Sequence, residues 1–183
     1  MLESYICSKV RLMRIPENET ASAVSKLKNV FNFPNPVNEV AARMVAGMVL
    51  TLSLAIIFTD QSWLMFLLAY GFLARVATGP TLSPMGLLAT RVLVPMVGNP
   101  QRSVPGPPKR FAQSIGLVFS IVALTLYFAV GSVVAAKGVL GVLVLFAALE
   151  SGVGFCAGCY VFGYLMKWGL IPKSVCEECV VTV

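Results

Sequence analysis

The chain has 183 residues, of which 57% are hydrophobic and only 12% are charged, and its net charge is +6. Soluble domains average about 25% charged residues, so this composition, with a mean hydropathy of +0.83, excludes an ordinary soluble protein. The basic residues form no patch with interleaved aromatic side chains, so the positive charge gives no support to nucleic-acid binding.

The predicted elements begin with a polar extension, residues 1–36, which we expect to be cytosolic and partly disordered. Four apolar stretches follow, each close to the ~20 residues with which a helix crosses a ~30 Å hydrocarbon core. In lipid the backbone must form its hydrogen bonds within its own segment, so these stretches are predicted to be helices. The predicted spans are Val40–Phe58, Ser62–Thr78, Ser114–Val134 and a stretch that begins at Gly138 and extends as far as Leu165.

These spans predict an all-α integral membrane protein, whose four transmembrane helices form one domain over residues 37–168. Residues 169–183 form a cysteine-containing tail. Asp60 and Lys137 are the only charged residues in the connections after the first and third spans. Basic residues gather before the first span, in the middle loop and after the last span. By the positive-inside rule, both termini and the middle loop are predicted to be cytosolic.

The loop between the second and third spans contains its own apolar segment. The breaker cluster at residues 78–84 ends the second helix, and residues 85–97 are apolar but too short to span. Residues 79–98 are therefore expected either to lie at the membrane interface as an amphipathic helix or to enter the membrane and return. Residues 99–108 form a Pro-rich cytosolic turn before the third span.

Two cysteines in the last predicted span, Cys156 and Cys159, form the main candidate site. Thiolates are the nucleophiles of redox and sulfur chemistry, and nearby cations lower thiol pKa values. Arg43, Arg75 and Arg110 fall at about the same depth as the two cysteines, and we expect Arg43 as the supporting cation. Gln113 is expected as a polar wall of the same pocket. In a regular helix a disulfide at this spacing would be strained, and it would need a local distortion at Gly158.

Three further charged residues are secondary candidates. Arg75 and Arg110 lie near the cytosolic ends of their spans, where they would either hold an oxyanion or extend toward lipid headgroups. Glu150 lies within the last span, where an acid is a functional candidate by default. On a regular helix Glu150 points away from Cys159, and its alternative role is a buried carboxyl bonded to a neighbouring helix.

The tail carries a second dithiol, Cys176 and Cys179. With the first pair it gives a C-x2-C-x16-C-x2-C spacing that is typical of zinc sites. The intervening residues are mostly apolar helix, so we expect no metal and no bound cofactor. The tail pair would either exchange electrons with the buried pair through mixed disulfides or carry palmitate.

Four local motifs occur in the same order as in a family of small membrane proteins, domain of unknown function 4395, which the chain resembles over about residues 33–165. The motifs are Asn38-Glu39 with Ala42-Arg43, Gly79-Pro80 with Ser83-Pro84, Arg110-Phe-Ala-Gln113, and Phe155-Cys-Ala-Gly-Cys159. The resemblance implies a compact four-helix membrane fold and no established activity.

The leading functional expectation is a cytosol-facing membrane thiol protein that exchanges disulfides or handles reduced sulfur through Cys156 and Cys159, with a thioredoxin-like or sulfurtransferase protein as partner. Two alternatives stay open. One is a small transporter of anions or protons that would need to be a homo-oligomer and would use Glu150. The other is a non-enzymatic assembly factor, in which the small-residue faces at Gly154 and Gly158 bind partner helices.

Overall fold

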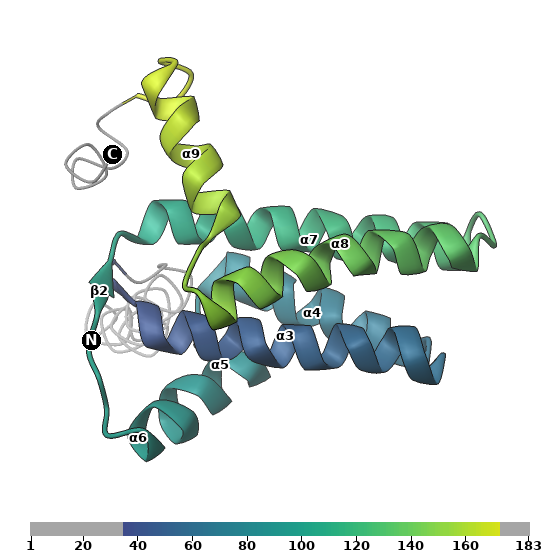
Figure 1. The fold of residues 1–183 in the computed structure, drawn as a ribbon, viewed down its shortest axis with the longest axis horizontal. Coiled ribbons are helices and arrows are strands. Elements are labelled where there is room, and N and C mark those ends of the chain that lie inside the picture. Colours follow the sequence, from purple (N-terminus) through teal and green to yellow (C-terminus); the bar gives the residue numbers. More distant parts are fainter. Residues whose placement is uncertain (1–34, 173–183) are drawn as a thin grey trace, which may run out of the picture. The chain divides into compact units, whose positions relative to one another are not determined.

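The computed structural model describes residues 35–172. This part of the chain is mainly helical and contains two short strands (Figure 1). In chain order the elements are β1 (Val37–Asn38), α3 (Glu39–Thr59), α4 (Trp63–Thr78), α5 (Pro84–Leu88), the π-helix η1 (Ala89–Leu93), α6 (Val94–Met96), β2 (Ser103–Val104), α7 (Gly106–Phe128), α8 (Val133–Gly152) and α9 (Ala157–Lys167).

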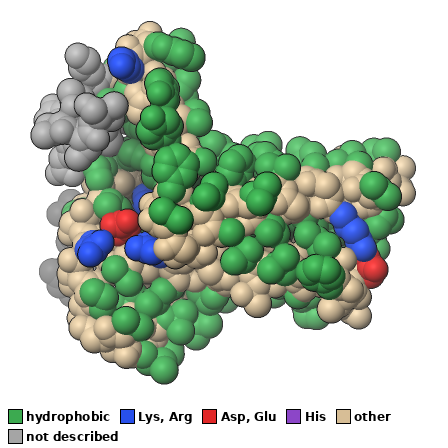
Figure 2. Space-filling view, in the orientation of Figure 1, with side chains coloured by type: hydrophobic (Ala, Val, Ile, Leu, Met, Phe, Trp, Pro, Cys, Tyr) green, Lys and Arg blue, Asp and Glu red, His purple; other side chains and the backbone are tan. Residues whose placement is uncertain are grey.

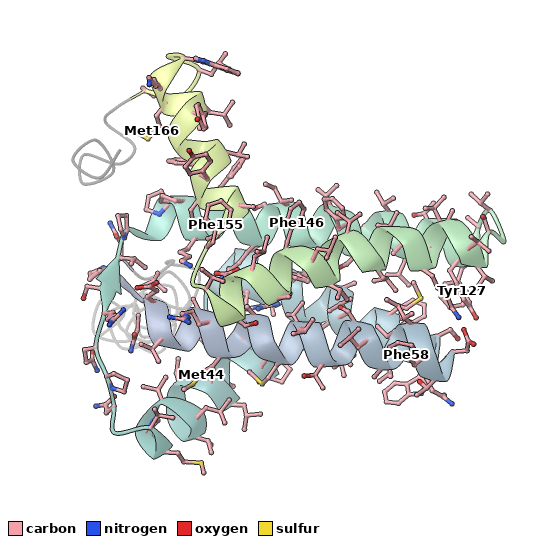
Figure 3. The ribbon with its side chains drawn as sticks, viewed as in Figure 1. Met44, Phe58, Tyr127, Phe146, Phe155 and Met166 are labelled. Atoms are coloured by element: carbon pink, nitrogen blue, oxygen red, sulfur yellow. The ribbon has the colours of Figure 1, made fainter. Side chains whose placement is uncertain are left out.

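Helices α3, α4, α7 and α8 form a bundle in which α3 packs on α8, and α7 packs on both α4 and α8 (Figure 1). Close approach is possible because many buried positions hold alanine or serine; small residues let helix backbones approach in a membrane. Phe58 on α3 and Tyr127 on α7 mark the end of the bundle that lies away from α9 (Figure 3). The small buried residues are Ala41, Ala46, Ser53, Ser120, Ala123, Ala136 and Ala147.

Three helices in the described part of the chain are long and apolar enough to cross a membrane: α3, α7 and α8. Helix α4 is also apolar but has 16 residues. The view in Figure 2 shows hydrophobic side chains over much of the surface between the two ends of the bundle, with charged side chains near those ends. At one end Lys137 pairs with Asp60 at 2.6 Å. The prediction of an all-α protein with membrane-type helices is therefore confirmed.

The expectation that the last apolar stretch continues as one helix to Leu165 is wrong. Helix α8 ends at Gly152, and α9 begins only at Ala157. Between them Gly154 has φ +77°, a left-handed conformation that favours glycine, and Cys156 is extended with φ −97° and ψ 100°. Phe155 lies in this connection (Figure 3). As a result, Gly154 and Gly158 do not share one helix, and the small-residue face predicted across them does not form.

The loop between α4 and α7 folds into the short helical run α5–η1–α6. Ser83 caps α5, its Oγ accepting a hydrogen bond from the amide of Gly86 at 3.3 Å. Met85 and Ala89 are buried toward α3 and α4, whereas Leu88 and Met96 are exposed. One side of the run therefore packs on the bundle, and its other side is exposed and largely apolar.

Strands β1 and β2 hold the start of α3 beside the start of α7. They pair antiparallel, with Val37 opposite Val104 and Asn38 opposite Ser103. The Asn38 side chain caps α3 by accepting from the amide of Val40 at 3.0 Å, and it donates to the carbonyl of Pro100 at 3.1 Å. This end of the bundle therefore gathers the beginnings of α3 and α7 and the end of α8.

Candidate thiol site

A cavity of about 480 Å³ opens among α3, α4, α7, α8 and α9. Helices α7 and α8 each contribute residues spaced i, i+3, i+4 and i+7, which form one face of a helix. On α3 the lining residues are small or β-branched and apolar, which leaves the space unfilled. The lining includes Lys109, Ala112, Gln113 and Gly116 from α7, Leu143, Phe146, Ala147 and Glu150 from α8, and Ala41, Ala42, Val45, Ala46 and Val49 from α3.

The walls of this cavity are mainly apolar, and its polar groups come from a few side chains. Phe119 and Phe146 both line it, with their ring centroids 6.2 Å apart in an edge-to-face arrangement. Phe146 is labelled on α8 in Figure 3. The polar side chains on the lining are Asn38, Arg75, Thr90, Lys109, Gln113, Glu150 and Cys156.

Cys156 lines the cavity at the N-cap of α9, and Cys159 is the third residue of that helix. The Cys159 thiol donates a hydrogen bond to the sulfur of Cys156, with the two Sγ atoms 2.8 Å apart. Both thiols are free. The extended backbone at Cys156 allows this approach, so the predicted distortion at Gly158 is not needed, and Gly158 lies within the regular helix.

Gly158 instead holds α9 against α7. A Cβ atom at this position would lie 2.6 Å from both the Cα and the Cβ of Ala112, closer than real contacts allow. Helix α7 also approaches α4 closely, since a Cβ atom at Gly116 would lie 2.2 Å from the ring of Phe72. Direct packing of α9 on α7 therefore places the dithiol at the cavity.

The two thiols have different acidities. The hydrogen bond from Cys159 lowers the pKa of Cys156, and the nearby ammonium of Lys109 acts in the same direction, against burial and the charge of Glu150. The same hydrogen bond, together with burial, raises the pKa of Cys159. Cys156 is therefore the more acidic of the two thiols.

Lys109 forms an ion pair with Glu150 at the cavity, with Nζ 2.8 Å from Oε1. Sequence reasoning placed Lys109 only among the topogenic basic residues and missed this role. The signal was its spacing: Lys109, Ala112, Gln113 and Gly116 share one face of a helix that starts at Gly106, earlier than the predicted Ser114. The break after α8 also means that Glu150 and Cys156 line one cavity, which a continuous helix did not predict.

Arg75 is 4% exposed and faces the same cavity. Its Nε donates to the carbonyl of Gly71 at 2.9 Å, and its guanidinium carbon lies 4.5 Å from the centre of the Phe72 ring. Within residues 35–172, Arg75 Nη2 and Gln113 Oε1 are buried and have no hydrogen-bond partner. The cavity thus holds one unmet donor and one unmet acceptor.

Among the described residues, three predicted ones lie outside the lining: Cys159, which reaches the cavity only through its hydrogen bond to Cys156, Arg43 and Arg110. Arg43 donates from Nη2 to the carbonyl of Gly152 at 2.7 Å and to that of Ser151 at 3.2 Å, so it caps the C-terminus of α8. Arg110 is exposed, and its Nε donates to the carbonyl of Val76 at 3.0 Å. The structure therefore brings Gln113, Glu150 and Arg75 together with Cys156, and it gives Arg43 and Arg110 other contacts. The second dithiol, Cys176 and Cys179, lies outside the described residues.

Comparison with known proteins gave one family. The model of the family described as Domain of unknown function (DUF4395) matches residues 37–167, from the first strand to the end of α9, and so covers every residue of the cavity except Pro36. Neither the curated proteins nor the solved structures contain a match to the chain. The match covers well over half of the sequence, and the chain therefore belongs to the DUF4395 family.

Proposed function

We propose that this protein is a membrane-embedded thiol protein that exchanges disulfides through Cys156 and Cys159. The observation that carries the proposal is the hydrogen bond from the Cys159 thiol to the Cys156 sulfur at 2.8 Å, at the wall of a cavity. It supplies both parts that exchange needs: an activated attacking thiol and a second thiol within reach of it.

The exchange proceeds in two balanced steps. The Cys156 thiolate attacks one sulfur of a partner disulfide, so that a mixed disulfide forms and the partner's second sulfur leaves as a thiolate. Cys159 then loses its proton and attacks Cys156 Sγ, which forms the Cys156–Cys159 disulfide and releases the partner's first sulfur. Two electrons pass to the partner, and the reverse sequence oxidises a partner dithiol.

Electrostatics around the pair support this order of attack. Lys109 stabilises negative charge on Cys156, while its ion pair with Glu150 keeps the ammonium at the cavity. Cys156 also stands at the N-terminus of an 11-residue helix, where the helix dipole favours a thiolate. A thioredoxin-like or sulfurtransferase protein, which presents a disulfide or a persulfide at its surface, is the partner class that fits.

The proposal includes a membrane topology. We take α4 as a fourth span beside α3, α7 and α8, with both termini and the α4–α7 loop in the cytosol. The arginines and lysines near the α3 start and in the α4–α7 loop support this orientation. Single cysteines introduced at Gln61 and Gln101 of a Cys-free variant test it: an impermeant maleimide applied to the outside should label residue 61 and leave residue 101 unlabelled.

Trapping tests the chemistry. A Cys159→Ser variant lacks the resolving thiol, so Cys156 should remain joined to its partner in a mixed disulfide that dithiothreitol releases. Cys156→Ser is the matched control and should trap nothing. A Cys156 that alkylates slowly in intact membranes, and that stays reduced after mild oxidant together with Cys159, would overturn the proposal and leave the pair as packing residues.

A further inference from the structure

The cavity holds two buried polar atoms that the described protein does not satisfy, and they point to a ligand. Arg75 Nη2 is a charged donor on α4, and Gln113 Oε1 is an acceptor on α7. Leaving such groups unpaired in a buried site costs free energy. A ligand that accepts a hydrogen bond from Arg75 and donates one to Gln113 in at least one of its states would remove that cost.

The rest of the lining requires the ligand to be largely apolar. Val49, Phe119, Leu143 and Phe146 contribute hydrocarbon or aromatic surface, and their helices α3, α7 and α8 are long and apolar enough to cross a membrane. The volume of about 480 Å³ lies in the range of small-molecule sites. A small inorganic anion would satisfy Arg75 but would leave most of this apolar surface without contacts.

Cys156 adds a chemical requirement, because its thiol lines the same cavity and accepts a hydrogen bond from the Cys159 thiol. Each round of the exchange proposed above moves two electrons onto or off this dithiol. When the pair oxidises a partner dithiol it is left reduced, and a ligand in the cavity that takes up two electrons and two protons would then regenerate its disulfide. Carbonyl oxygens that become hydroxyls, carried on an apolar ring, match the donor of Arg75, the acceptor of Gln113 and the walls together.

We propose that the cavity binds a membrane quinone, which oxidises the Cys156–Cys159 dithiol; this inference rests on the proposed function of the pair. In the reaction the two S–H bonds break and one S–S bond forms. Two electrons and two protons convert the two quinone carbonyls into hydroxyls, so one quinol appears for each disulfide. Arg75 donates to a quinone oxygen and stabilises the charge that develops there, and Gln113 accepts from the hydroxyl that results.

Binding is tested without electron transfer in the Cys156→Ser/Cys159→Ser variant, purified in detergent. Decylubiquinone should raise its Tm, because a ligand that binds only the folded state stabilises it. Decanol, which has the alkyl chain and no quinone ring, should not. Adding Arg75→Gln or the size-conserving Gln113→Leu should abolish most of the shift, whereas the exposed Arg91→Gln should keep it. An equal shift with decanol, or none with either compound, would overturn the inference.

Electron transfer is tested in the wild-type protein, reduced, freed of reductant and mixed anaerobically with decylubiquinone. We expect one quinol per Cys156–Cys159 disulfide, measured by absorbance and by loss of maleimide labelling, and a rate at least about tenfold lower in Gln113→Leu or Arg75→Gln. If the dithiol reduces a soluble disulfide but yields no quinol, the inference fails and the proposed function stands. If it reacts with neither, both fail.

Discussion

Lys109 Nζ and Glu150 Oε1 lie 2.8 Å apart, and each charge stands at the end of its own helix that the helix dipole disfavours. Lys109 is in the first turn of α7, where the partial charge is positive, and Glu150 is in the last turn of α8, where it is negative. Neither residue therefore stabilises its helix alone. Each charge is instead neutralised by the other, through the ion pair that joins α7 to α8 at the wall of the thiol cavity.

Breaking this pair should destabilise the protein more than removing it. Lys109→Met leaves Glu150 unpaired and Glu150→Gln leaves Lys109 unpaired, so each should lower the free energy of unfolding by about 2 kcal/mol. The Lys109→Met/Glu150→Gln double variant leaves neither charge unpaired and should cost less than either single change. Thermal unfolding of the four proteins in one detergent measures this cycle, and additive costs would contradict the coupling.

The acidity of Cys156 should be visible in its alkylation. The thiolate is the reacting form, so the rate rises as pH passes the pKa. Because the pKa of Cys156 is lowered, the rise should be centred at a lower pH than that of an unperturbed thiol. Cys159→Ala removes the donated hydrogen bond and should move the midpoint to higher pH. Stopped alkylation followed by mass spectrometry gives both profiles, and superimposable curves would argue against the bond.

Gly158 should be intolerant of even a methyl group. Gly158→Ala places a Cβ atom 2.6 Å from the backbone of Ala112, so α9 must move away from α7, at a cost of about 1–3 kcal/mol. The displaced helix should also slow formation of the Cys156–Cys159 disulfide by oxidant. Gly141→Ala is the matched control, because nothing lies within 4 Å of its added atom. Equal behaviour of the two variants would exclude direct packing at Gly158.

Arg43 should stabilise the end of α8 and not the thiolate. Arg43→Met removes the donors to the carbonyls of Ser151 and Gly152, and we expect a loss of about 1–3 kcal/mol. Hydrogen exchange at residues 151–156 should become faster, while the pH midpoint of Cys156 alkylation should stay where it was. The exposed Arg91→Met controls for loss of an arginine. A shifted midpoint would restore the role that sequence reasoning assigned to Arg43.

Hydropathy was sufficient to predict membrane-type helices where α3, α7 and α8 lie, because a membrane imposes helices on long apolar stretches. Their bounds differ from the prediction: α7 ends at Phe128 and α8 begins at Val133, so the turn between them lies inside the predicted span Ser114–Val134. The same reasoning missed the break between α8 and α9. No proline interrupts residues 138–165, and the apolar character continues through the break. The local signal was Gly154, which follows the last residues of α8 in a left-handed conformation, and the amide of Phe155 donates back to the carbonyl of Leu149 at 3.2 Å. Arg43, 108 positions away from Ser151 in the chain, adds contacts to the end of α8 that no local pattern carries.

The site was partly visible in the same way. Gln113 and Cys156 both line the cavity, and the sequence analysis expected Gln113 in the wall of a pocket around the cysteines. The role of Lys109 was missed because a lysine after a Pro-rich turn resembles an ordinary cytosolic charge. Helix α7 begins at Gly106, and this early start places Lys109 on the helix face that lines the cavity. Glu150 was predicted to point away from Cys159 because both residues were placed on one regular helix, and α8 ends at Gly152, between them.

The break at residues 153–156 also separates the thiols from the register of α8. In a continuous helix, one residue inserted between Leu143 and Glu150 would turn everything after it by about 100° and carry both cysteines away from the cavity. Here the four-residue connection can absorb such a change, since the position of α9 is set by its contact with Ala112 on α7. The length of α8 can therefore change without moving the thiols, and the lengths of α8 and α9 can vary independently.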